Sequence, residues 1–208
     1  MYGLLVLLSR RCYNHTVFFV NVPPANCRRK CEIERDENQM QIAWLRLSFF
    51  LALALILQGL RLFLPMIQGP VQMFLIGSLL NAVMAMAVRS TRTRWALVIG
   101  AALPVGAFWQ GQLPVLPMVP VVALGNMAFQ LAVFYLRGRG VFAAPVLKAA
   151  LLYAGTQLVL DLFALPAPLA ALLSFMMSWP QIVTGVLGLL LAHILLRRTH
   201  ALTEHDAY

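Results

Sequence analysis

Long runs of apolar residues, interrupted by short polar segments, fill the chain from residue 40 to residue 198. A helix needs roughly 20 apolar residues to cross the hydrocarbon core of a bilayer, and several runs come close to this length. They are predicted to be transmembrane helices at about residues 45–64, 71–88, 95–109, 118–136, 144–165 and 172–196. The third run is short and contains Pro104, and the sixth contains Pro180. The pattern predicts an all-α integral membrane protein with about six transmembrane helices.

Basic residues occupy alternate connections between these runs. They are Arg46, Arg89, Arg92, Arg94, Arg137, Arg139, Arg197 and Arg198. The intervening connections, residues 112–120 and 166–170, contain no Lys or Arg. Because cytoplasmic loops are enriched in Lys and Arg, both ends of the chain are predicted to be cytoplasmic.

Composition supports a membrane protein and argues against a nucleic-acid binder. Hydrophobic residues make up 61% of the chain, charged residues 11%, and the mean hydropathy is +0.80. The net charge of +9 could suit nucleic acid, but the basic residues are scattered at the ends of the runs rather than gathered on one face. We therefore expect a lipid bilayer as the partner of these residues, and no nucleic acid.

The chain divides into three parts by the same pattern. Residues 1–39 form a poorly defined N-terminal extension, residues 40–198 the six-helix membrane domain, and residues 199–208 a polar cytoplasmic tail. Met40 directly precedes the first run, so one hypothesis is that the start is misassigned and Met40 is the initiator. The extension holds all three cysteines, but Cys27 and Cys31 have no second matching pair, and no metal or cofactor is expected.

Polar residues within the runs recur at helical spacing, which gives several helices one polar face. Tyr153, Gln157 and Asp161 form such a stripe, as do Asn126 with Gln130. Others are Ser78 with Asn81, and Ser174, Ser178, Gln181 and Thr184. These faces are expected to point into the bundle, because a polar group facing lipid is costly.

The polar residues near the outer ends of the helices are predicted to converge on a pocket open to the outside. They are Gln58, Arg61, Gln68, Trp109, Gln110, Gln112, Asn126, Gln157, Asp161, Trp179 and Gln181. Arg61 is the only Lys or Arg on that side after Met40, so the topology rule does not explain it. Lys148, near the cytoplasmic end of its helix, is expected to reach the lipid headgroups instead.

Packing roles remain open for the same residues. Trp109 and Trp179 also suit an interfacial aromatic belt, and Asn81, Asn126 and the serines suit hydrogen bonds between helices. Arg61 and Asp161 could form a structural ion pair.

Motifs for catalysis are missing from the sequence. It contains no Gly-x-x-x-x-Gly-Lys-Ser/Thr phosphate loop, no His-Glu-x-x-His pair and no Gly-x-Ser-x-Gly elbow. Asp161 is the one acidic residue between Met40 and the tail, so paired carboxylates are missing too. We expect no enzymatic activity and no ATPase site.

Short motifs in the membrane domain resemble the S components of energy-coupling factor (ECF) importers. They are Arg-Leu-Phe-Leu-Pro-Met from Arg61, Gly69-Pro70, the segment from Gly77 to Asn81, Gly125-Asn126, and Ser178-Trp179-Pro180-Gln181. The resemblance covers roughly residues 40–198. It implies a six-helix subunit in the plasma membrane of a prokaryote that captures a small vitamin-like micronutrient from outside.

The same resemblance implies partners. An S component docks on a transmembrane coupling subunit, which is driven by two cytoplasmic ATPases, through small residues of its first helix. Ser48 and Ala52 are the nearest equivalents here, in place of the two alanines usual in the family. An internal packing face is the alternative role for this pair.

The residue types in the predicted pocket suggest a small heterocyclic substrate. Tryptophan offers a flat surface to a ring, amides offer paired donors and acceptors, and Arg61 offers a site for a carboxylate or phosphate. Two rival functions stay open: a secondary transporter that couples flux to ions through Asp161, and a non-transporting membrane scaffold.

Overall fold

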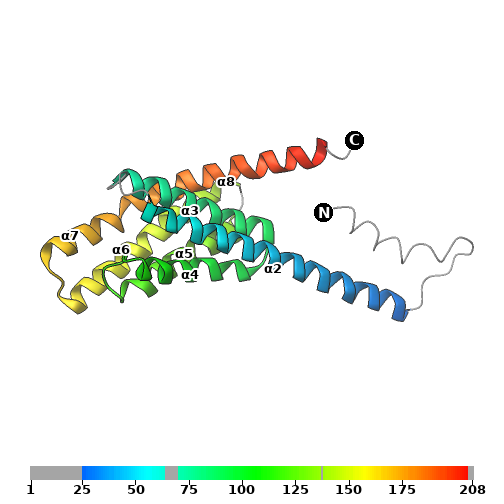
Figure 1. Cartoon of the computed structure of the whole chain (residues 1–208), viewed down its shortest axis with the longest axis horizontal. Helices are drawn as coiled ribbons and strands as arrows, with labels where there is room; N and C mark the ends of the chain where they lie inside the picture. Colours follow the sequence, from blue (N-terminus) through cyan, green and yellow to red (C-terminus); the bar gives the residue numbers. More distant parts are fainter. Residues whose placement is uncertain (1–24, 64–69, 137, 206–208) are drawn as a thin grey trace, which may run out of the picture. The chain divides into compact units, whose positions relative to one another are not determined.

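The structure is a computed structural model that describes residues 25–63, 70–136 and 138–205, with most side chains between Glu37 and Arg198. Throughout these ranges the regular structure is helical (Figure 1). The helices are α2 (Ala25–Phe63), α3 (Pro70–Thr91), η1 (Arg94–Ala96), α4 (Leu97–Trp109), α5 (Met118–Tyr135), η2 (Gly138–Phe142), α6 (Ala143–Phe163), α7 (Ala167–Met176) and α8 (Trp179–His205).

The chain separates into two units, Met1–Gln41 and Ile42–Tyr208. Helix α2 begins in the first unit and continues into the second. The second unit holds the rest of α2 and all the later helices, and the fold and site below belong to it.

Five helices of the described chain are long and apolar enough to cross a membrane, and Arg94–Trp109 is a shorter apolar helix. This confirms the predicted all-α membrane fold. Two differences from the predicted helices stand out, the start of the first helix and the division of the sixth. Helix α2 begins at Ala25, well before residue 45, because the Arg, Lys, Glu and Gln residues that precede the apolar run are good helix formers.

The predicted sixth span is two helices. Helix α7 ends at Met176 and α8 begins at Trp179, so Pro180 lies in the first turn of α8. Proline has no backbone N–H and clashes with the preceding turn inside a helix, but fits the first turn without loss. The break therefore falls just before Pro180.

Pro104 stays inside α4 because its helix is repaired by a side chain. A proline cannot donate to the carbonyl four residues earlier, which here belongs to Gly100. Nδ2 of Asn126 on α5 donates to that carbonyl oxygen at 3.3 Å. A polar side chain thus satisfies a backbone group that would otherwise be exposed to apolar surroundings.

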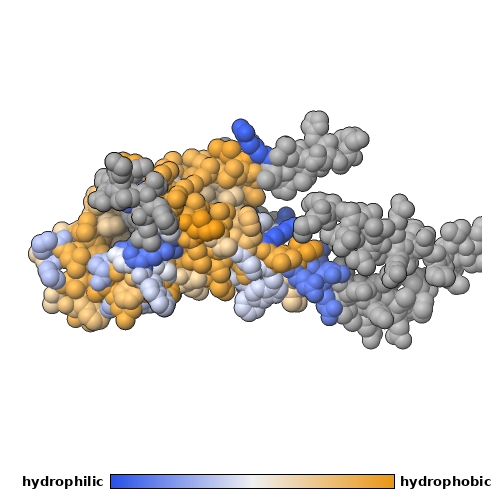
Figure 2. All heavy atoms as spheres, in the orientation of Figure 1, coloured by the Kyte–Doolittle hydropathy of each residue, from blue (hydrophilic) through white to orange (hydrophobic). Residues whose placement is uncertain are grey.

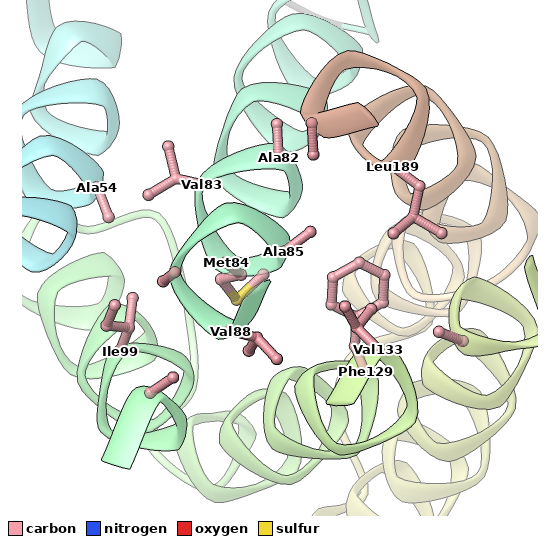
Figure 3. Packing of buried hydrophobic residues seen from close by; sticks show 14 of the residues in the cluster. Ala54, Ala82, Val83, Met84, Ala85, Val88, Ile99, Phe129, Val133 and Leu189 are labelled. Atoms are coloured by element: carbon pink, nitrogen blue, oxygen red, sulfur yellow. The ribbon is translucent and has the colours of Figure 1, made fainter. Parts of the chain in front are cut away.

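Helix α3 lies at the centre of the core and packs most extensively against α8. In Figure 3, Val83 of α3 points toward Ala54 of α2, while Phe129 of α5 and Leu189 of α8 lie beside each other. Small residues allow the close approach of α3 and α8. A Cβ atom added to Gly188 would lie only 2.6 Å from Cβ of Asn81.

The outer surface is apolar, as a lipid-facing surface requires. Large side chains such as Leu45, Ile56, Leu124 and Leu162 are each more than three-fifths exposed, and most of the coloured surface in Figure 2 is hydrophobic. A water-soluble protein rarely exposes so much contiguous apolar surface. The chain is a multi-pass membrane protein.

Basic segments from different helices meet at one end of the bundle. Nη1 of Arg46 donates to the backbone oxygen of Ser90 at 3.1 Å. The rings of Trp44 and Trp95 are 5.4 Å apart, and the guanidinium of Arg94 lies 6.0 Å from the ring of Tyr135. The opposite ends of these helices, with the connection between α4 and α5, form the other end.

Candidate ligand-binding site

A cavity of about 350 Å³ lies within the bundle and is lined by residues of α2 to α8. This volume is within the range of small-molecule sites. Most of the lining is apolar, with Met73, Ile76, Leu103, Leu173 and Met177 among it. The polar lining residues are Gln58, Asn81, Gln112, Asn126, Lys148, Gln181 and Thr184.

Lys148 forms the polar floor of this cavity. It lies in the second turn of α6, is 5% exposed, and donates from Nζ to Oδ1 of Asn81 at 2.8 Å. The ring of Phe129 lies 5.6 Å from Nζ, within the range of a cation–π interaction. In the described chain no carboxylate pairs with this ammonium.

The orientation of Asn81 is fixed by a chain of hydrogen bonds. Its Nδ2 donates to Oγ1 of Thr184 at 3.4 Å, and that hydroxyl donates to the backbone oxygen of Gln181 at 3.2 Å. With the amide nitrogen occupied by α8, the amide oxygen faces Lys148. Three helices, α3, α6 and α8, therefore hold the floor in place.

The mouth of the cavity is at the end away from the arginines. Asn81 is near the middle of α3, so the floor is at about half the depth of the bundle. The lining continues to Gln112, Leu113 and Pro114 in the connection between α4 and α5, and to Leu169 of α7. The cavity thus extends from the centre of the bundle toward the end that carries the α4–α5 connection.

Amide side chains of the walls are anchored to backbone oxygens. Nε2 of Gln58 donates to Leu103 O at 3.0 Å and Nε2 of Gln181 to Met176 O at 3.0 Å. Gln58 is 2% exposed, and its Oε1 has no hydrogen-bond partner in the described chain. A buried acceptor without a donor is costly, and Oε1 of Gln130, which is outside the cavity lining, is in the same state.

The structure brings only part of the predicted pocket together. Gln58, Gln112, Asn126 and Gln181 line the cavity. Gln110 lies beside it, where its Oε1 accepts a hydrogen bond from Nε2 of Gln112. The side chain of Arg61 and the whole of Gln68 fall outside the described residues.

Trp109, Gln157, Asp161 and Trp179 do not line the cavity. Trp109 is 88% exposed at the end of α4, and Trp179 packs against Phe74 and Phe175. Nε2 of Gln157 donates to Oγ of Ser174 at 3.2 Å, which ties α6 to α7. Asp161 is exposed. The role of Trp109 and Trp179 in an interfacial aromatic belt stays a prediction.

The inward face of α6 differs from the expected one. Tyr153 and Asp161 are exposed, whereas Lys148, Leu152 and Thr156, also four residues apart, are buried. The expectation that Lys148 reaches the headgroups was wrong, because α3 presents Asn81 to its ammonium. The burial of Lys148 could have been inferred from the small and apolar residues Ala149 and Leu152, which lie near it on the same side of the helix.

Ser48 and Ala52 lie on an exposed face of α2. From Ile42 to Leu60 the buried residues are Leu47, Ala54 and Gln58, which share one stripe of the helix. Ser48 and Ala52 lie off this stripe, and Oγ of Ser48 donates to Trp44 O within α2 at 3.0 Å. Gly59, with open space around its Cβ position, continues the small-residue face.

Comparison of the chain with models of protein families, with curated proteins and with solved structures finds no match.

Proposed function

We propose that this chain is the substrate-binding subunit, or S component, of an energy-coupling factor importer in the plasma membrane of a prokaryote. The cavity carries the proposal. It is enclosed within one small helical bundle, has the volume of a small-molecule site, and places amides and a lysine among apolar walls. By the positive-inside rule the arginine end faces the cytoplasm, and the mouth then faces outside.

Two further features suit this function. The chain contains no phosphate-binding loop, so energy would come from partner ATPases. Ser48 and Ala52 are exposed on α2, and the Cβ position of Gly59 has open space around it, so a transmembrane coupling subunit could approach this face closely. Substrate would enter the cavity from outside, and docking through α2 would deliver it to the coupling subunit.

An ion-coupled transporter that works through Asp161 has less support. Its titratable group would have to lie on the transport path, and Asp161 is exposed outside the cavity lining. For a pure scaffold, a cavity of this volume lined by amides and a lysine would have no use.

A thermal-shift screen tests the proposal. The purified full chain in detergent is incubated with a panel of water-soluble vitamins and their precursors. A ligand that binds only the folded state stabilises it, by about 2.7 kcal/mol at a hundredfold excess over its dissociation constant. We expect one saturable ligand, and ATP-dependent uptake of that ligand in cells that also produce the coupling subunit and ATPases.

A pair of matched substitutions locates the site. Gln181→Leu changes an amide of the cavity, and Gln130→Leu changes a buried amide of α5 that bonds to Ala96 O and does not line the cavity. We expect only Gln181→Leu to weaken binding. Equal binding by both variants, or no saturable ligand and no uptake, would overturn the proposal.

A further inference from the structure

We infer that the ligand of this cavity carries a carboxylate, which binds Nζ of Lys148 at the floor. The inference rests on the proposed function and names its substrate class. Lys148 is a cation that is almost fully buried inside a membrane protein, and its one hydrogen-bond partner in the described chain, Asn81, is uncharged.

The lysine has spare bonding capacity on the cavity side. An ammonium has three N–H donors, of which one is accepted by Oδ1 of Asn81. The Phe129 ring covers another side of Nζ. Because Lys148 itself lines the cavity, a ligand oxygen can reach the remaining donors. A buried charge is costly unless it is paired, so the cavity favours an anion at this point.

The surroundings select a single negative charge. Lys148 is the only charged residue of the cavity lining among the described residues. One N–H of the Asn81 amide is donated to Oγ1 of Thr184, and no second cation among the described lining residues is there to balance a phosphate dianion. One ammonium balances one carboxylate, and a charge-assisted hydrogen bond forms between them.

The walls define the rest of the ligand. They are mostly apolar, which suits a ligand with an uncharged, largely apolar body. The substrate class is therefore a small monocarboxylic acid whose remaining atoms are mostly apolar.

Matched acid and neutral molecules test this on the unmodified full chain in detergent. The probes are nicotinate with nicotinamide, pantothenate with pantothenol, and biotin with its amide, measured by calorimetry and thermal shift. We expect at least one acid to bind saturably, and at least about tenfold more tightly than its neutral counterpart, because the neutral molecule leaves the lysine unpaired.

Lys148→Met keeps the length of the side chain and removes its charge. In this variant the preference for the acid should disappear, while Gln130→Leu retains it. If a neutral probe binds the wild-type chain with the same affinity as its acid, the inference is overturned and the proposed function stands. The same holds if Lys148→Met folds and keeps the preference. Binding of no probe of either kind counts against both.

Discussion

Glycines at helix contacts determine how closely the helices of this bundle approach one another. The space around them differs widely from site to site. A Cβ on Gly188 would meet Asn81 Cβ at 2.6 Å, Ser78 O at 2.8 Å and Ala82 N at 2.9 Å, whereas one on Gly59 would meet nothing within 4 Å. Backbone atoms of α3 cannot move aside as a flexible side chain can.

We therefore predict opposite effects of the same substitution at these two positions. Gly188→Ala should lower the free energy of unfolding by about 1–3 kcal/mol, because it forces α8 away from α3. Gly59→Ala should be neutral or stabilising by up to about 1 kcal/mol, since alanine favours the helix. Thermal unfolding of the purified variants in detergent measures both. A Gly188→Ala variant as stable as wild type would contradict the packing of α3 against α8.

Single residues also show which burial states could be predicted from the sequence. Asn126 and Gln130 were expected inside from their spacing, and they are 5% and 0% exposed. Lys148 could not be placed in the same way. A lysine six residues into a helix from the cytoplasmic end suits lipid headgroups as well as a cavity, and only the packing of α3 beside α6 brings Asn81 to 2.8 Å.

At the scale of elements, α2 combines a narrow buried stripe with a broad exposed face. Ala54 is 0% exposed and belongs to the core, whereas Ala52, two residues away, is exposed. The proposed function uses the second face for docking. Binding and transport should therefore depend on different sides of one helix.

Ala52→Phe tests this separation. We expect it to leave ligand binding and stability unchanged and to reduce ATP-dependent uptake at least about tenfold, because a bulky side chain prevents close helix approach. Ala154→Phe, at an exposed alanine of α6, is the matched control and should keep uptake. Both activities are measured on the same preparations. Equal loss of binding and uptake in Ala52→Phe would point to an internal packing role instead.

The elements were largely predictable, and their ends were not. Apolar runs and arginines locate the membrane helices, because the bilayer imposes length and the topology rule imposes charge. The break between α7 and α8 depends on how Pro180 is accommodated, and a proline is compatible with either a kink or a helix start. Pro104, by contrast, lies inside α4, because Asn126 donates a hydrogen bond to the carbonyl oxygen of Gly100.

For the whole molecule, the predicted orientation places the basic ends inside the cell and the cavity mouth outside. Single cysteines test it in a chain whose three native cysteines are replaced by serine. Leu116→Cys lies in the exposed α4–α5 connection and Gly140→Cys in the exposed α5–α6 connection. A membrane-impermeant maleimide should label the first in intact cells and the second only after lysis. The reverse labelling would place the cavity mouth in the cytoplasm.

The short length of α4 has a consequence for the surrounding lipid. Even with the preceding η1, the apolar helix Arg94–Trp109 spans only about 25 Å, against a hydrocarbon core of about 30 Å. Lipid tails beside α4 must compress to match it, and each ångström of this mismatch costs a fraction of a kcal/mol. Helix α4 is the neighbour of α2 through Gln58 and Leu103. A protein that covers this side displaces the compressed lipid, so relaxation of elastic stress in the bilayer would itself draw a partner to α2.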